Sequence, residues 1–311
     1  MKLNKRELVN VVGITTILLS LIFIIKVFLS FDIEFSSLFS PKYILFLGIS
    51  LLATVLAIMF NAFGWKITIE FFSGNKVNFL PAFHTYAKSN LGKYLPGNVG
   101  HYASRQLFGA SLGMSQTQLA VASVFEIMYF VITALLLSFV LTRNKIYSIA
   151  KSLFPALNIL LFLSVGAVLG ISATAILLFF FRKNSCLKEI LTLIRTRGFW
   201  CLLLKNLLIT SANFLIGGLS FILIVGINVT IIANSTAVIF AAYVASWLIG
   251  FVIPGAPGGI GVREAVLTFM LSHLYMEEII LTAAVFQRLT MVGGDVMAWI
   301  ISAILLKKRL R

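Results

Sequence analysis

Six long apolar stretches constrain the fold of this chain more than any other feature of its sequence. They lie at about 8–31, 43–64, 118–141, 157–181, 200–227 and 279–306. Each is long enough to cross the hydrocarbon core of a bilayer, which requires about 20 helical residues. Because a bilayer offers no water to the backbone, such segments must be helical. The sequence therefore predicts an all-α polytopic membrane protein, with residues 1–311 forming a single integral membrane domain.

The positive charges of the chain flank these stretches instead of gathering in one domain. Hydrophobic residues make up 60% of the sequence, charged residues make up 11%, and the net charge is +15. Basic residues concentrate at Lys2–Arg6, Arg182–Arg197 and Lys307–Arg311, and the positive-inside rule places such flanks in the cytoplasm. We expect a multi-pass protein of the cytoplasmic (inner) membrane with both termini cytoplasmic, and no nucleic-acid partner.

Two further segments, 79–109 and 235–273, fit neither a full span nor a simple loop. The first carries charged and polar side chains such as His84 and Lys88, and the second is apolar up to Ile253 and then rich in glycine and proline. Helices broken inside the membrane are tolerated where they line a cavity, and they are typical of transporter binding sites. We expect two re-entrant or broken helical hairpins in addition to the six full spans.

A proline–glycine motif followed by an arginine occurs once in each of these segments. The copies are LPGNVGHYASRQ, with Pro96, Gly97, Gly100 and Arg105, and IPGAPGGIGVRE, with Pro254, Gly255, Gly258 and Arg263. Corresponding positions lie 158 residues apart, and the later stretch LAVASVFE, ending at Glu126, resembles LTAAVFQ, ending at Gln287. Three predicted spans separate the hairpins, so the hairpins would enter from opposite faces. The sequence predicts an inverted repeat with halves at about 43–141 and 200–306.

Each motif is suited to bind an anion. Glycines let a ligand approach the backbone closely, and the helix that follows presents unpaired N–H groups with partial positive charge. An arginine in its first turns adds a permanent charge that can bind phosphate oxygens bidentately. The predicted lipid phosphate-binding residues are Arg105, Arg263, Gly97, Gly100, Gly255, Gly258 and Gly259. The alternative is structural: the glycines allow close helix packing, and each arginine pairs with a carboxylate or loop carbonyls.

Five other ionisable residues are secondary candidates for binding or coupling. They are Glu126, Lys93, Glu264, Arg288 and Asp295. Charged groups within an apolar span are costly and usually face the bundle interior. Glu126 is predicted either to neutralise Arg105 or Arg263 or to carry a coupling proton. Structural ion pairs are the favoured interpretation for Arg288 and Asp295, and we expect no catalytic residue, metal site or cofactor.

The stretch Pro254–Glu264, together with Pro96–Arg105, resembles the flippase-like family of lysylphosphatidylglycerol synthase transmembrane regions. The resemblance covers essentially the whole chain and is more specific for the later stretch. It implies a polytopic protein that moves an anionic or modified lipid between leaflets. Some members carry a soluble aminoacyltransferase domain, which does not follow in this sequence, so lysyl transfer is not expected.

The expected function is a lipid flippase or transporter for an anionic phospholipid or a polyprenyl-phosphate-linked lipid, and not an enzyme. One alternative is a membrane-embedded transferase acting on a lipid phosphate, which is disfavoured because the two aspartates, Asp32 and Asp295, cannot form a DxD-type metal site. The other alternative is a non-transporting accessory subunit of a glycosyltransferase or lipid synthase. Basic cytoplasmic loops would allow such docking, but attraction to anionic lipids explains them equally well.

Overall fold

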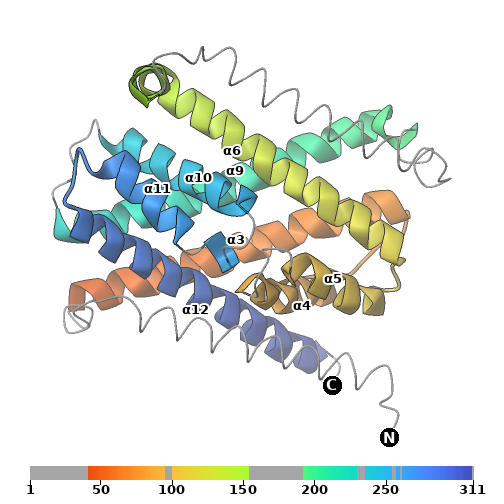
Figure 1. Cartoon of the computed structure of the whole chain (residues 1–311). Helices are drawn as coiled ribbons and strands as arrows, with labels where there is room; N and C mark the ends of the chain where they lie inside the picture. Colours follow the sequence, from red (N-terminus) through yellow and green to blue (C-terminus); the bar gives the residue numbers. More distant parts are fainter. Residues whose placement is uncertain are drawn as a thin grey trace, which may run out of the picture.

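A computed structural model of the chain describes residues 41–94, 100–153, 192–229, 231, 235–253, 257–259 and 261–309. Within these residues the protein is helical and contains no strand (Figure 1). The long helices are α3 (Pro41–Ser73), α6 (Gln116–Leu153), α9 (Arg197–Asn228) and α12 (Glu277–Arg309). Each contains a stretch long and apolar enough to cross a membrane. The all-helical class of the described residues is thereby confirmed, and their four apolar helices indicate a membrane protein.

The long helices correspond to predicted spans. These are the spans at 43–64, 118–141, 200–227 and 279–306, whereas 8–31 and 157–181 lie outside the described residues. Two helices continue well beyond their apolar stretches, α6 to Leu153 and α3 to Ser73. In the extension of α3, Lys66 and Glu70 form an ion pair of 2.8 Å one turn apart, and the Asn206 side chain of α9 donates to Thr68 Oγ1 at 3.3 Å. The total number of spans stays a prediction.

Helix ends are set by local signals in the sequence. α6 begins at a reciprocal cap, in which the Ser115 N–H donates to Gln118 Oε1 at 3.0 Å and the Gln118 N–H donates to Ser115 Oγ at 3.2 Å. Such a cap satisfies backbone groups that have no partner within the first turn. α12 has Glu277 and Glu278 in its first turn and Lys307, Lys308 and Arg309 in its last turn. Acidic side chains at the start of a helix and basic side chains at its end interact favourably with the helix dipole.

The segments 79–109 and 235–273 form broken helices, as the sequence predicts. The first contains α4 (Phe79–Asn90), the 3₁₀ turn η1 (Leu91–Tyr94) and α5 (Gly100–Gly109), followed by the turn η2 (Ala110–Leu112). The second contains α10 (Thr236–Val252), the turn η4 (Pro257–Gly259) and α11 (Val262–Leu271). Pro96, Gly97, Pro254 and Gly255 lie outside the described residues.

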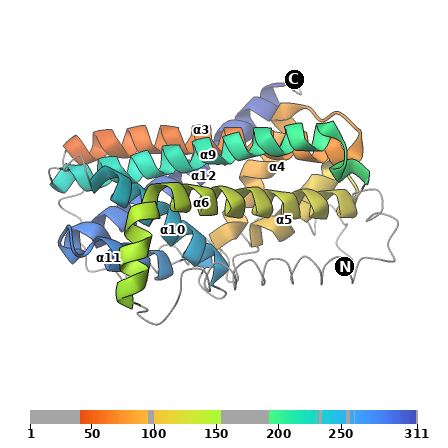
Figure 2. The ribbon, with the colours of Figure 1, turned by 90° about the horizontal axis from the view of Figure 1, so that it is seen from above.

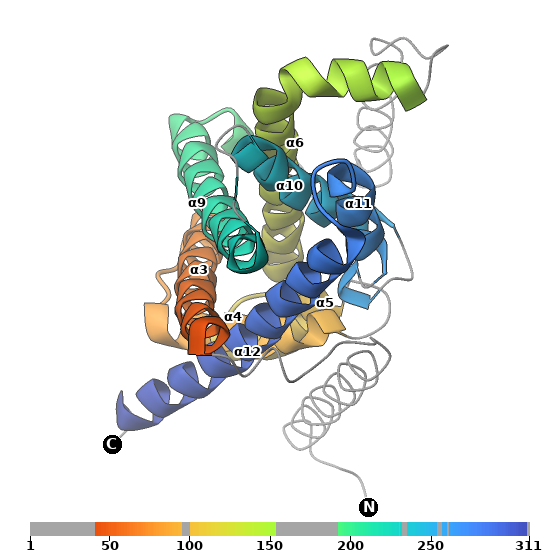
Figure 3. The ribbon, with the colours of Figure 1, turned by 90° about the vertical axis from the view of Figure 1, so that its left-hand side faces the viewer.

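The two broken helices occupy opposite ends of the bundle. In Figures 1 and 2, α4 and α5 lie near the end where α6 and α9 begin, and α10 and α11 lie near the end where α12 begins. Viewed along the long helices, α3 and α9 lie side by side on one side of the molecule, with α10 and α11 on the other (Figure 3). The described turns of the two segments, η1 and η4, contact each other.

Each hairpin packs into its own apolar cluster. Trp65 of α3, Phe83 of α4 and Leu119 of α6 are buried together around the first hairpin. Phe214 of α9 and Leu267 of α11 belong to the separate cluster around the second hairpin. Burial of aromatic and aliphatic side chains on this scale fixes the helices closely enough to hold polar groups between them.

Candidate functional site

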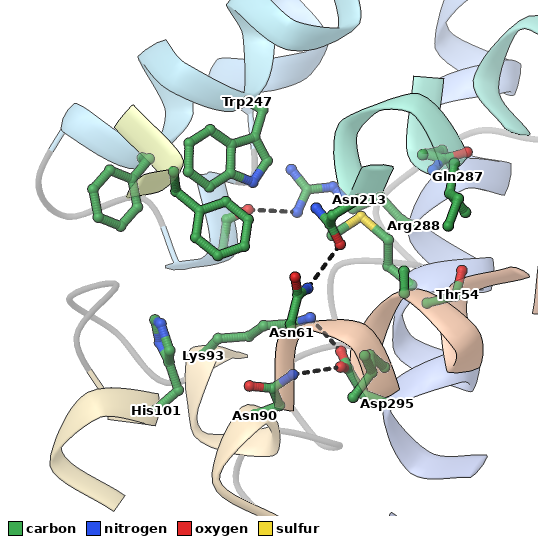
Figure 4. A pocket seen from close by; sticks show the side chains of 18 of the residues that line it. Thr54, Asn61, Asn90, Lys93, His101, Asn213, Trp247, Gln287, Arg288 and Asp295 are labelled. Atoms are coloured by element: carbon green, nitrogen blue, oxygen red, sulfur yellow. Dashed lines mark hydrogen bonds and ion pairs between the residues drawn. The ribbon is translucent and has the colours of Figure 1, made fainter. Parts of the chain in front are cut away.

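A cavity of about 170 Å³ lies where the turns of the two hairpins meet the long helices (Figure 4). Its wall includes Lys93 and His101 from the first hairpin, Tyr243 and Arg263 from the second, and Arg288 and Asp295 from α12. The two turns touch each other, since η1 packs against η4 beside Gly258. The cavity is thus built from both copies of the repeated motif.

Arg105 is fully buried in α5, at 0% exposure, and its guanidinium is already occupied. Its Nη1 pairs with the carboxylate of Glu126 in α6. The Nε donates to Ser89 Oγ at 3.2 Å, and Nη2 donates to Asn90 Oδ1 at 3.2 Å. The ring of Tyr86 lies 4.0 Å from its Cζ. Arg105 is not found among the described residues that line the cavity, so this geometry matches the structural alternative for Arg105 and does not support direct phosphate binding.

Glu126 is the counter-ion of Arg105. Its second oxygen accepts a hydrogen bond from the Tyr86 hydroxyl at 2.8 Å. Both carboxylate oxygens therefore have a buried partner, one charged and one neutral. Of the interpretations left open by the sequence, the structure places Glu126 against Arg105 and not against Arg263.

Arg263 lies at the start of α11 and has no such counter-ion among the residues that the structure describes. Its Nε is buried and has no hydrogen-bond partner within the described residues. No carboxylate of the described part of the chain forms an ion pair with it. The side chain passes over Gly250, where a Cβ would lie 2.7 Å from the Arg263 Cγ. A glycine at this position is therefore what allows the arginine to reach the cavity.

Arg288 holds the turn of the second hairpin. It forms an ion pair of 2.8 Å with Glu264 and donates to the carbonyl oxygens of Gly258 and Gly259 at 2.7 and 2.9 Å. These two glycines have φ values of 59° and 72°, a region that favours glycine. Glu264 also accepts from the Gly261 N–H at 2.8 Å, so both of its oxygens are engaged. These contacts agree with the structural interpretation favoured for Arg288 from the sequence.

Asp295 holds the turn of the first hairpin. It is fully buried in α12, pairs with Lys93 and accepts from the Tyr94 hydroxyl at 2.6 Å. The Asn90 side chain approaches its other oxygen at 3.4 Å. α12 thus fixes the two hairpin turns through two separate ion pairs, one at Arg288 and one at Asp295.

The two halves of the cavity share contacts that the sequence analysis did not identify. Tyr86 and Ser89 in α4 correspond to Tyr243 and Ser246 in α10 at an offset of 157 residues. In both pairs the serine hydroxyl donates to the tyrosine carbonyl, at 2.8 Å in each case. A shared Tyr-x-x-Ser sequence preceding each proline–glycine motif was the available signal. It extends the likeness between the motifs into the preceding helices.

Glycines occupy corresponding crossing points in the two hairpins. A Cβ at Gly92 would lie 2.8 Å from the Gly100 carbonyl oxygen and 2.8 Å from Ser104 Oγ. Gly250, 158 residues later, is crowded by the side chain of Arg263. A side chain at Gly92 would therefore press on the backbone of the other arm, and one at Gly250 would displace the Arg263 side chain.

The remaining wall of the cavity combines amides with aromatic rings. Figure 4 shows Asn61 and Asn213 joined by their hydrogen bond near the centre, with Trp247 above them. The Trp247 ring is stacked on Phe251 at a centroid distance of 5.4 Å. None of these side chains carries a motif that sequence reasoning alone could have recognised, because they come together only when distant helices pack.

The fold and the site define a helical membrane protein with a polar, arginine-containing cavity between two broken helices. Comparison with models of known protein families and with curated protein sequences found no match. Among the described residues, no group of three or more His, Cys, Asp or Glu side chains has the arrangement of a metal site.

Proposed function

We propose that this protein is a lipid flippase or transporter that binds the anionic headgroup of a phospholipid, or of a polyprenyl-phosphate-linked lipid, at Arg263. The observation that carries this proposal is that Arg263 lines a central cavity, has a buried Nε without a hydrogen-bond partner in the described chain, and forms no ion pair with a described carboxylate. An uncompensated cation within a membrane costs several kcal/mol or is neutralised by an anion. A lipid phosphate is the anion that a membrane supplies in the greatest amount.

The charge of the surrounding residues supports this assignment. Every carboxylate that lines or adjoins the cavity in the described chain is paired with another cation: Glu126 with Arg105, Glu264 with Arg288, and Asp295 with Lys93. Because each of these three ion pairs is neutral, the net charge of the set is the single positive charge of Arg263. The same pairing leaves no carboxylate of this set free to act as a general base, which favours transport over a transferase reaction.

The proposed mechanism uses the two hairpins as an inverted pair. Their positions at opposite ends of the bundle would give the cavity access to one leaflet when the first hairpin moves and to the other when the second moves. The two ion pairs of α12 would keep each hairpin turn in place while the other rearranges.

Single-cysteine labelling tests this topology. We expect cysteines at Asn78 and Gln116, at the two ends of the first hairpin, to react with an impermeant reagent from the cytoplasm, and a cysteine at Glu277 to react from outside. Cys186 and Cys201 are replaced first. Reaction of positions 78 and 116 from opposite faces would show that the first hairpin spans the membrane and would remove the inverted pair from the mechanism.

Transport itself is tested with purified protein in liposomes. We expect fluorescent phosphatidylglycerol placed in the inner leaflet to become accessible to an external quencher faster than in protein-free liposomes, whereas labelled phosphatidylcholine, with no net charge, should move little faster than in the protein-free control. Equal rates with and without protein for every anionic lipid tested, including a polyprenyl phosphate, would reject the proposed function.

A further inference from the structure

We propose that the anion bound at Arg263 carries a single negative charge, as a phosphodiester does, and that Tyr243 and Gln287 complete its site. This inference rests on the proposed function and names the chemical class of its substrate. Its basis is a difference between the two halves of the cavity, which otherwise share a series of contacts.

The first half contains a complete, neutral set of groups. Arg105 lies against the ring of Tyr86, and Glu126 neutralises the arginine while accepting from the Tyr86 hydroxyl. A single carboxylate, with one negative charge, thus occupies the position between an arginine and a tyrosine. Glu126 therefore shows that an arginine and a tyrosine placed in this way bind an anion with one negative charge.

The second half has the same arginine and tyrosine but lacks the carboxylate. Tyr243 corresponds to Tyr86, and Arg263, which interacts electrostatically with Tyr243, corresponds to Arg105. Gln287 follows Val285 and Phe286 in α12, whereas Glu126 follows the same two residue types in α6. The Tyr243 hydroxyl lies within hydrogen-bonding reach of Gln287. An amide is therefore found where the first half has its counter-ion, and Gln287 and Arg263 both line the cavity.

The missing charge defines the ligand. With glutamine at position 287, Arg263 keeps one uncompensated positive charge, because its neighbour Glu264 is engaged by Arg288 and by the Gly261 N–H. A phosphodiester carries one negative charge and would neutralise the site. A phosphate monoester carries about −1.5 to −2 at neutral pH and would leave excess negative charge in a buried cavity, which is unfavourable. Gln287 can also donate an amide N–H to a phosphate oxygen, which a carboxylate cannot.

The Gln287→Glu variant tests the inference by supplying the charge from the protein itself. We expect transport of labelled phosphatidylglycerol to fall at least tenfold, because the new carboxylate pairs with Arg263 and repels the headgroup. Gln116→Glu makes the same chemical change at an exposed position at the start of α6 and should transport at the wild-type rate. Wild-type transport by Gln287→Glu would overturn the inference.

A binding measurement separates this inference from the proposed function. In detergent, phosphatidylglycerol should raise the thermal midpoint of the wild-type protein but not that of Gln287→Glu, whose midpoint without lipid should already be higher than that of the wild type. If this pattern is found while no lipid is transported, the anion site stands and the flippase function fails. If phosphatidylglycerol shifts both proteins equally, the inference fails whether or not transport occurs.

Wild-type specificity gives a test that does not depend on any variant. Phosphatidylglycerol should be bound at least tenfold more tightly than phosphatidic acid, a phosphate monoester, and stronger binding of phosphatidic acid would overturn the inference. Soluble glycerophosphoglycerol distinguishes the source of the phosphodiester. Competition by this compound at concentrations similar to those of the lipid would assign the site to a free phosphodiester and not to a lipid headgroup.

Discussion

Replacing Arg105 with glutamine is expected to destabilise the folded protein by about 3–5 kcal/mol, the usual cost of removing one partner from a buried ion pair. The variant would leave Glu126 buried beside Tyr86 without its cation, and it would also remove the bonds to Ser89 and Asn90. The change in free energy of unfolding can be measured by denaturant titration in mixed micelles, with the intrinsic fluorescence of the four tryptophans, which include the buried Trp65, as a probe.

The matched control is the double variant Arg105→Gln/Glu126→Gln. Removing both charges leaves two amides that can bond to each other, so most of the lost stability should return. If the single and double variants were equally unstable, the ion pair would not be the source of the effect. If Arg105→Gln folded as stably as the wild type, Arg105 would not hold the first hairpin in the way that the geometry indicates.

Replacing Arg263 with glutamine is expected to impair transport and not stability. Transport of phosphatidylglycerol should fall more than tenfold, and the free energy of unfolding should be equal to or above that of the wild type. Arg263 contributes no ion pair within the described chain, and removing an uncompensated buried cation removes a cost to folding. Arg263→Lys should transport at an intermediate rate, because an ammonium group keeps the charge but cannot bind two phosphate oxygens in the planar geometry of a guanidinium. Initial transport rates in liposomes and thermal midpoints in detergent measure the two effects separately.

If Arg263→Gln lost as much stability as Arg105→Gln, the proposed difference in role between the two arginines would be wrong. It would mean that Arg263 has an energetically important partner in the folded protein and is not available to a ligand.

The sequence was sufficient to predict those features of the fold that the bilayer enforces. Four predicted spans coincide with long helices because about 20 apolar residues in a membrane can satisfy their backbone only as helix. The breaks in segments 79–109 and 235–273 were also predictable, since proline and glycine together end helices. The extension of α3 to Ser73 was not, because it depends on side-chain pairing with α9 and within α3.

The different roles of the two arginines could not be predicted from their motifs. Arg105 and Arg263 occupy the same position relative to proline and glycine, so local sequence treats them as equivalent. What separates them is the residue that a neighbouring long helix presents, Glu126 in one half and Gln287 in the other. The relevant contact is between segments that are far apart in the chain, and it is set by helix packing.

The sequence did not reveal how the secondary candidates pair. Arg288 and Asp295 lie on one face of α12 and form ion pairs with Glu264 and Lys93 respectively, which agrees with the structural interpretation favoured for them from the sequence. The sequence does not reveal that these partners belong to the turns of opposite hairpins. In the folded protein both turns lie against each other and are bonded to α12.

We propose that Arg263, and not Arg105, binds the lipid headgroup. The most direct test compares the initial rate of phosphatidylglycerol transport by Arg263→Gln with that by Arg105→Gln/Glu126→Gln, each reconstituted at equal density and corrected for the folded fraction. We expect the Arg263 variant to lose more than nine-tenths of the wild-type rate and the double variant to keep most of it. Equal losses in the two variants, or a larger loss in the double variant, would contradict headgroup binding at Arg263.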